Sequence, residues 1–238
     1  MTQYLRLDGK YIVSTARTLA SRVEERFPYR HLSAIARDLV TLSESTLRLS
    51  HDLARPWWRI RIVCCTGLLL LFGAVVGVLA SIDLNLAPRG AWEWMAALES
   101  AINDLVFIGV AAWFLFSIEE RLKRRRALSS LHALRALAHL IDMHQLTKDP
   151  ERAIDPTPDT KSSPQRGLSP FELSRYLDYC TEMLALVGKL SALLVQDFPE
   201  PVVLATVNDL ESLTSGLSRK IWQKIDIVCR LTSLTATP

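Results

Sequence analysis

The sequence predicts an all-α membrane protein, in which a two-helix transmembrane hairpin is joined to a cytoplasmic helical bundle. Three observations predict this class. Two apolar runs lie in the first half of the 238 residues, Lys and Arg are concentrated outside the segment between these runs, and apolar residues elsewhere recur at helical spacing. No segment alternates apolar and polar residues for long enough to indicate a sheet.

The first apolar run, residues 62–82, contains no charged residue. A helix rises about 1.5 Å per residue, so this run covers the roughly 30 Å hydrocarbon core of a bilayer. We therefore predict a membrane span over about 60–82. Cys64 and Cys65 lie in this segment, where buried apolar packing is their expected role.

The second uncharged run, residues 105–118, is shorter, and runs of this length also occur in buried or re-entrant helices. The run reaches a spanning length when it is extended backward past Asp104. We predict a second span over about 101–118, with residues 83–100 as the outer loop.

The positive charges indicate the orientation of the hairpin. Arg55, Arg59 and Arg61 precede the first span, and five cations follow the second, whereas Arg89 is the only cation between residues 83 and 104. Because segments rich in Lys and Arg stay in the cytoplasm, the loop should face outward and both termini inward. A one-span protein is the alternative, but it would not account for this asymmetry.

A basic run follows the second span, and we predict that it binds anionic lipid headgroups, at about 1 kcal/mol per residue. Basic residues are not interleaved with aromatic ones here, and the net charge is only +3, so no nucleic-acid partner is predicted. The basic run consists of Arg121, Lys123, Arg124, Arg125 and Arg126.

Two features of the predicted spans indicate contacts inside the membrane. Gly73, Gly77 and Ser81 recur every four residues, and small residues at this spacing let helix backbones approach closely in lipid. This stripe could pack within the hairpin or between subunits. Asp104 and Glu99 are candidates for a pore or polar pathway, because ionisable groups in a span are costly and mark polar contacts. The alternative for Asp104 is a position at headgroup level.

The segments outside the hairpin have the apolar spacing of packed helices. Before the membrane, a seam with steps of three and four residues reaches Pro56, and a shorter helix is predicted over 11–26. Ser169, Pro170 and Glu172 predict a capped helix start. The pre-membrane seam is Leu32, Ile35, Leu39, Leu42, Thr46, Leu49 and Leu53; the later stripes are Leu131, Leu134, Ala138 and Ile141, then Leu173, Leu177, Cys180, Leu184, Val187 and Leu194, and finally Val203, Val207, Leu210, Leu217, Ile221, Ile225 and Val228.

These patterns predict five segments. They are cytoplasmic N-terminal helices (1–56), the transmembrane hairpin (57–120), the basic run and a cytoplasmic helix (121–148), a Pro-rich linker (149–169) and a C-terminal helical hairpin (170–235). The pre-membrane, post-membrane and C-terminal helices are predicted to form one cytoplasmic bundle.

Motifs for catalysis and for cofactor binding are absent from the sequence. It contains no P-loop, GxGxxG, GxSxG, HExxH or paired CxxC motif. His139 and Asp142 lie one helical turn apart and could contribute to a metal site only if a second helix completed it. We therefore expect no enzymatic activity, no cofactor and no metal, with surface histidines as the ordinary interpretation.

The sequence thus predicts a non-enzymatic, oligomeric integral membrane protein whose cytoplasmic bundle senses or docks a partner and acts through the hairpin as a regulated pore or membrane effector. The alternative is a membrane-anchored scaffold or adaptor without conductance. The expected partners are the lipid bilayer, further copies of the chain and a cytoplasmic protein. The excess of Arg over Lys suggests a bacterial source, and hence a bacterial inner membrane.

Overall fold

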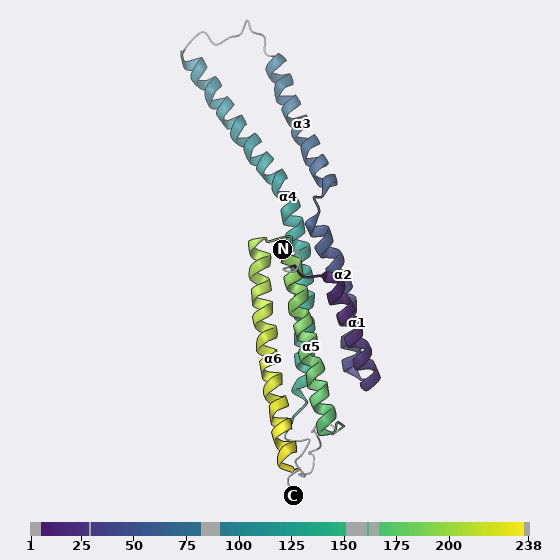
Figure 1. Cartoon of the computed structure of the whole chain (residues 1–238). Helices are drawn as coiled ribbons and strands as arrows, with labels where there is room; N and C mark the ends of the chain where they lie inside the picture. The colour runs from purple at the N-terminus through teal and green to yellow at the C-terminus, as the bar shows by residue number, and fades with distance from the viewer. Residues whose placement is uncertain (1–5, 29, 82–90, 151–160, 162–166, 236–238) are drawn as a thin grey trace. The chain divides into compact units, whose positions relative to one another are not determined.

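The computed structural model describes residues 6–28, 30–81, 91–150, 161 and 167–235, and every regular element among them is a helix (Figure 1). The prediction of an all-α chain is confirmed for this part. The helices are α1 (Gly9–Arg26), α2 (His31–Ala54), α3 (Trp58–Ser81), α4 (Ala91–Leu146), α5 (Pro170–Val195) and α6 (Pro201–Thr235).

The chain divides into two compact units. The first combines Met1–Ala54 with Arg126–Pro238, and the second is Arg55–Arg125. The first unit therefore holds α1, α2, the end of α4, α5 and α6, whereas the second holds α3 and the remainder of α4.

Polar side chains define where three of the helices begin. The Asp8 carboxylate accepts hydrogen bonds from the backbone N–H groups of Lys10 and Tyr11 and caps α1. The predicted capping box at α5 is confirmed, because Ser169 Oγ accepts from Glu172 N and the Glu172 carboxylate accepts from Ser169 N. At α6, the buried Glu200 carboxylate accepts from Val203 N at 2.9 Å. Each contact satisfies N–H groups that a helix start leaves without partners.

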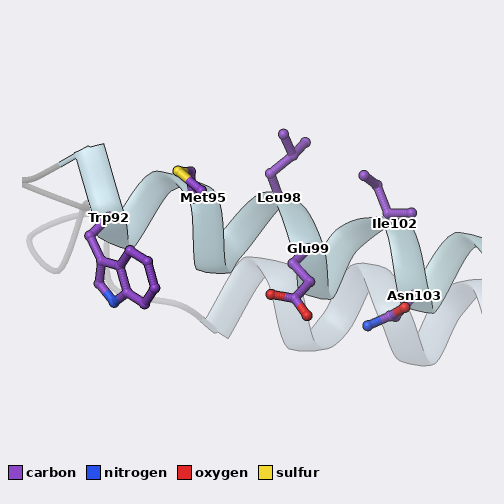
Figure 2. Close-up of a pocket in the computed structure, with 6 residues that line it drawn as sticks. All are labelled: Trp92, Met95, Leu98, Glu99, Ile102 and Asn103. Carbon is purple, nitrogen blue, oxygen red and sulfur yellow. The ribbon is translucent and has the colours of Figure 1, made fainter.

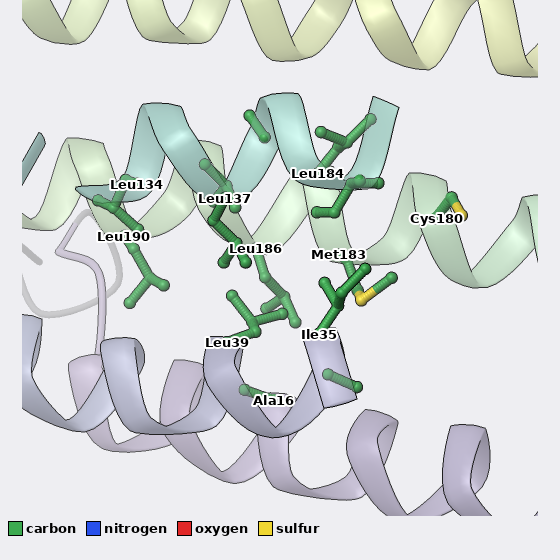
Figure 3. Close-up of a cluster of buried hydrophobic side chains, with 14 of the residues drawn as sticks. Ala16, Ile35, Leu39, Leu134, Leu137, Cys180, Met183, Leu184, Leu186 and Leu190 are labelled. Atoms are coloured by element: carbon green, nitrogen blue, oxygen red, sulfur yellow. The ribbon is translucent and has the colours of Figure 1, made fainter. Parts of the chain in front are cut away.

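One apolar core fills the first unit, where α5 packs against α1, α2 and α6. Figure 3 shows side chains from α1, α2, α4 and α5 converging, among them Ala16, Leu39, Leu134 and Met183. Every residue of the predicted stripes on α4, α5 and α6 is buried. At one edge of the core, Phe27 packs edge-on against Tyr176 at a centroid distance of 5.6 Å.

Five residues of the seam predicted on α2 are buried, and the other two are partly buried and pack against the core. Leu42 and Leu49 are half-buried, and the adjacent Ser43 and Ser50 are buried instead. The buried serines lose no hydrogen bonding, because Ser43 Oγ donates to Leu39 O at 2.6 Å and Ser50 Oγ donates to Leu47 O at 3.0 Å. A serine whose hydroxyl group donates to the backbone of its own helix can therefore take a buried position on α2 where leucine was expected.

Only one stretch of described helix is long and apolar enough to cross a membrane. It falls within His31–Ala74, which includes the first part of α3, and 6% of its apolar window is buried. The predicted second span over about 101–118 lies in α4 and does not meet the same criterion among the described residues. Its uncharged run is short, because Asp104 precedes it and Glu119 follows it.

Candidate functional site: the paired helices of residues 55–125

The second unit is unusual because its large apolar side chains face outward. Phe72 on α3 and Phe107 on α4 have 65% and 72% of their surface exposed. Large exposed apolar surfaces of this kind are uncommon on water-soluble monomers and are typical of interaction surfaces. The other exposed large apolar residues described in this unit are Ile62, Val63, Leu69, Leu70, Leu71, Val76, Met95, Leu98, Ile102, Leu105, Val106, Val110, Phe114 and Leu122, together with Trp58, Trp92 and Trp113.

Polar contacts join the two helices at one end of the unit, in what we call the basal ion cluster: Arg61, Glu119 and Lys123. Arg61 Nε donates to Glu119 Oε2 at 2.7 Å, and Lys123 Nζ lies 2.9 Å from Glu119 Oε1. The same carboxylate accepts from Trp57 N at 3.2 Å, and Lys123 Nζ donates to the Arg55 carbonyl oxygen at 2.7 Å. Glu119 therefore fixes the start of α3 against α4.

The surroundings of Glu119 change its acidity. Burial alone would raise the pKa of this carboxyl, but hydrogen bonds from Arg61, Lys123 and the Trp57 backbone outweigh burial and lower the pKa to about 2. Glu119 is therefore ionised at neutral pH. The Lys123 ammonium also lies 5.8 Å from the centre of the Trp57 ring, where a cation–π contact adds to the cluster.

A second contact between the helices lies one turn along α3, where Cys64 Sγ lies 3.4 Å from the Leu115 carbonyl oxygen, to which it donates. Cys64 is buried as expected, whereas the thiol-bearing side chain of Cys65 is exposed. Figure 1 shows α3 and the first half of α4 approaching each other near these contacts and separating toward residues 81 and 91.

Of the two residues predicted for a polar pathway, the structure describes the side chain of Glu99 only. The side chain of Asp104 lies outside the described residues. Glu99 is exposed and lines a hollow of about 330 Å³ along one helix, with Asn103 one turn further (Figure 2). Trp92, Met95, Leu98 and Ile102 complete this hollow, so it is mostly apolar with two polar groups on it.

The predicted small-residue stripe has free space beside Gly73 and Gly77, the two of its residues that the structure describes fully. A Cβ atom added at Gly73 or at Gly77 would meet no heavy atom of the chain within 4 Å. The side chain of Ser81 lies outside the described residues. Among the described residues, α4 therefore does not cover Gly73 and Gly77.

The basic run divides into inward and outward residues. Lys123 is buried in the basal ion cluster, so we no longer assign it to lipid headgroups. Arg121 is exposed, and its guanidinium lies 5.2 Å from the centre of the Phe114 ring. Arg125 and Arg126 are exposed and Arg124 is half-buried, so the headgroup hypothesis is kept for these arginines and Arg121.

The residues considered for a metal do not converge. His139 is exposed, and the Asp142 carboxylate accepts a hydrogen bond from Gln145 Nε2 at 2.7 Å. The described part of the chain brings together no group of three His, Cys, Asp or Glu that could hold a metal ion. We therefore do not propose His139 and Asp142 as metal ligands.

Sequence reasoning missed a histidine pair in the first unit. The rings of His31 on α2 and His144 on α4 are stacked at a centroid distance of 5.3 Å. Burial, followed by the nearby His31 and Lys148, lowers the pKa of His144 below its ordinary value. The sequence offers little signal for this contact, because the two residues meet only through the packing of the bundle.

Sequence reasoning also missed the basal ion cluster, for which a signal was available. Glu119 and Arg61 each stand at the border of an uncharged run, at the end where a hairpin brings its two helices together.

Comparisons of the chain with models of protein families, with curated proteins and with solved structures find no match.

Proposed function

We propose that this chain is a non-enzymatic, oligomeric integral membrane protein of a bacterial inner membrane. In this proposal residues 57–120 form a two-helix transmembrane hairpin, both termini lie in the cytoplasm, and the helical bundle of the first unit lies there too. The bundle senses or docks a partner, and the hairpin acts as a regulated pore or membrane effector.

The observation that carries this proposal is the outward apolar surface of α3 and α4, combined with a polar cluster at one end. Placing a Leu or Phe side chain in an apolar medium is favourable by about 1.5–3 kcal/mol. The exposed residues on the two helices would therefore stabilise insertion into lipid. The cations of the basal ion cluster and of Arg121 would then lie at the cytoplasmic interface, as the positive-inside rule requires.

Two observations support assembly into a pore rather than action as a single chain. Gly73 and Gly77 lie open on α3, where the backbone of a second helix could approach closely. Glu99 and Asn103 place polar groups on one face of α4, and Asp104 follows them in the sequence. A ring of hairpins could turn such polar groups toward a common axis.

A groove in the first unit favours the alternative function, a membrane-anchored scaffold or adaptor without conductance. The groove has a volume of about 520 Å³ and lies between α2 and α4, with Leu42, Leu137 and Leu140 in its walls. An apolar groove between helices suits the apolar face of a helix from a soluble protein. The groove would serve equally well as the docking surface of a regulated pore, so conductance separates the two functions.

The test has two stages. Membranes containing the protein are washed with alkaline carbonate, and the purified protein is then reconstituted into planar bilayers. The proposal requires that the protein resists carbonate extraction and that it produces discrete conductance steps. Release by carbonate would contradict membrane insertion, whereas resistance without conductance would favour the scaffold.

A further inference from the structure

A small cavity lies directly beside the basal ion cluster in the second unit. Its volume is about 210 Å³, which is below the roughly 300–1,000 Å³ typical of sites for drug-sized ligands. It can hold a compact charged group with a few adjoining carbons. The lining residues are Ile60, Arg61, Cys64, Cys65, Leu115 and Glu119.

The charges at this cavity do not cancel. Glu119 contributes one negative charge, while Arg61 and Lys123 contribute one positive charge each, so the basal ion cluster carries a net charge of +1. Lys123 is buried, and its ammonium is engaged by Glu119 and by the Arg55 carbonyl oxygen. The excess positive charge is therefore accessible at Arg61.

Arg61 uses only part of its hydrogen-bonding capacity. Its Nε donates to Glu119, and among the described residues no hydrogen bond engages its two terminal amino groups. The side chain has 54% of its surface exposed, so these amino groups can reach a ligand. A guanidinium with both terminal nitrogens available presents paired donors that fit two oxygens of one phosphate.

We propose that this cavity binds the phosphate group of an anionic phospholipid, with Arg61 as its main ligand. Free phosphate offers the same charged chemistry, but Ile60, Cys64 and Leu115 form an apolar wall that suits the carbon chain of a lipid. Basic pockets between membrane helices near the cytoplasmic surface bind lipid headgroups in this way. The inference rests on the proposed function, because it requires the hairpin to lie in a bilayer.

The test follows the thermal unfolding midpoint of the full chain, purified in a nonionic detergent, during titration with one of three probes. These are short-chain phosphatidylglycerol, short-chain phosphatidylcholine and inorganic phosphate. We expect phosphatidylglycerol to raise the midpoint by at least 3 °C and phosphatidylcholine to have less than a third of that effect. Inorganic phosphate should have none.

Three variants locate the site. Arg61→Gln should weaken the apparent affinity for phosphatidylglycerol at least tenfold, whereas Arg59→Gln, at an exposed arginine that does not line the cavity, should leave it within twofold. Cys65→Trp fills part of the cavity from an exposed position while keeping the basal ion cluster intact, so it should also weaken the affinity at least tenfold. If Arg61→Gln fails to fold, Cys65→Trp decides the question.

Four results would overturn the inference. They are the absence of any phosphatidylglycerol effect on the wild type, an equal effect in a folded Arg61→Gln variant, an equal effect in Cys65→Trp, and an equal effect of inorganic phosphate. Each of these rejects the lipid site alone. Failure of the proposed function is recognised separately, because a chain without a transmembrane hairpin would be released by carbonate.

Discussion

Replacing Glu119 by Gln removes the one negative charge of the basal ion cluster and keeps the shape of the side chain. The substitution leaves the buried Lys123 without its carboxylate and replaces one of the two acceptor oxygens, which Arg61 and Lys123 use separately, with an amide NH2 group. Removal of one partner from a buried ion pair is more harmful than loss of a surface pair, because it leaves an uncompensated charge away from water. The variant should therefore loosen the start of α3 from α4.

The size of the effect follows from the acidity of Glu119. Its pKa falls from an ordinary 4.5 to about 2, and each pKa unit corresponds to about 1.4 kcal/mol, which sets an upper limit of about 3 kcal/mol. Arg61 is half exposed and therefore screened by solvent, so we expect a loss of about 1–2 kcal/mol. For a chain of this size, that loss lowers the unfolding midpoint by about 2–8 °C.

The assay is thermal unfolding of the detergent-purified protein at pH 7.5, with Glu120→Gln as the matched control. Glu120 is the adjacent acidic residue and its side chain is exposed, so the control makes the same chemical change without touching the basal ion cluster. Glu120→Gln should stay within about 1 °C of the wild type. Equal midpoints for Glu119→Gln and Glu120→Gln would refute the reasoning.

Four further predictions concern acid stability, assembly and conduction. The stability that Glu119 contributes should be complete above pH 4.5 and should be lost as the pH falls from 4.5 toward 2. When thermal unfolding midpoints are compared across that range, this loss should be absent in the Glu119→Gln variant. The pKa of His144 in the folded state lies below the ordinary 6.5, so the unfolded chain takes up the proton first as the pH falls. The thermal unfolding midpoint of the wild type should therefore fall as the pH drops below about 6.5. The midpoint of the His144→Gln variant should fall less over the same range. Gly73→Leu combined with Gly77→Leu should convert oligomers into folded monomers in light scattering, whereas unfolding before dissociation would place the stripe inside the hairpin. Asp104→Asn should change conductance, or toxicity on overexpression, with insertion intact; unchanged behaviour would place Asp104 at headgroup level.

The elements that sequence reasoning predicted correctly are those whose signal is local. The capping box at Ser169 needs only residues three apart, and the stripes on α5 and α6 follow from the helical period. The seam predicted on α2 does not include the buried Ser43 and Ser50, because hydrophobicity alone gives no reason to prefer them to the partly buried Leu42 and Leu49. Their burial depends on hydroxyl groups that bond to the backbone of the same helix.

The basal ion cluster was missed for a different reason. The charge pattern of the sequence assigns Arg61 to membrane topology and Lys123 to lipid headgroups, which treats each cation separately from its neighbours. Pairing Arg61 with Glu119 requires the borders of the two uncharged runs to be considered together, because a hairpin brings these two borders into contact. The assignment of Lys123 to headgroups failed because Glu119 and the Arg55 carbonyl oxygen hold its ammonium inside the unit.

The measurement that tests the central claim most directly is the location of both chain ends and of the predicted outer loop. Reporters that are active only in the cytoplasm or only in the periplasm are fused after Pro238, before Met1 and within residues 83–100 of the full chain. The account predicts that both termini report from the cytoplasm and that the loop reports from the periplasm. Termini on opposite sides would leave a single span over about 60–82 and contradict the transmembrane hairpin.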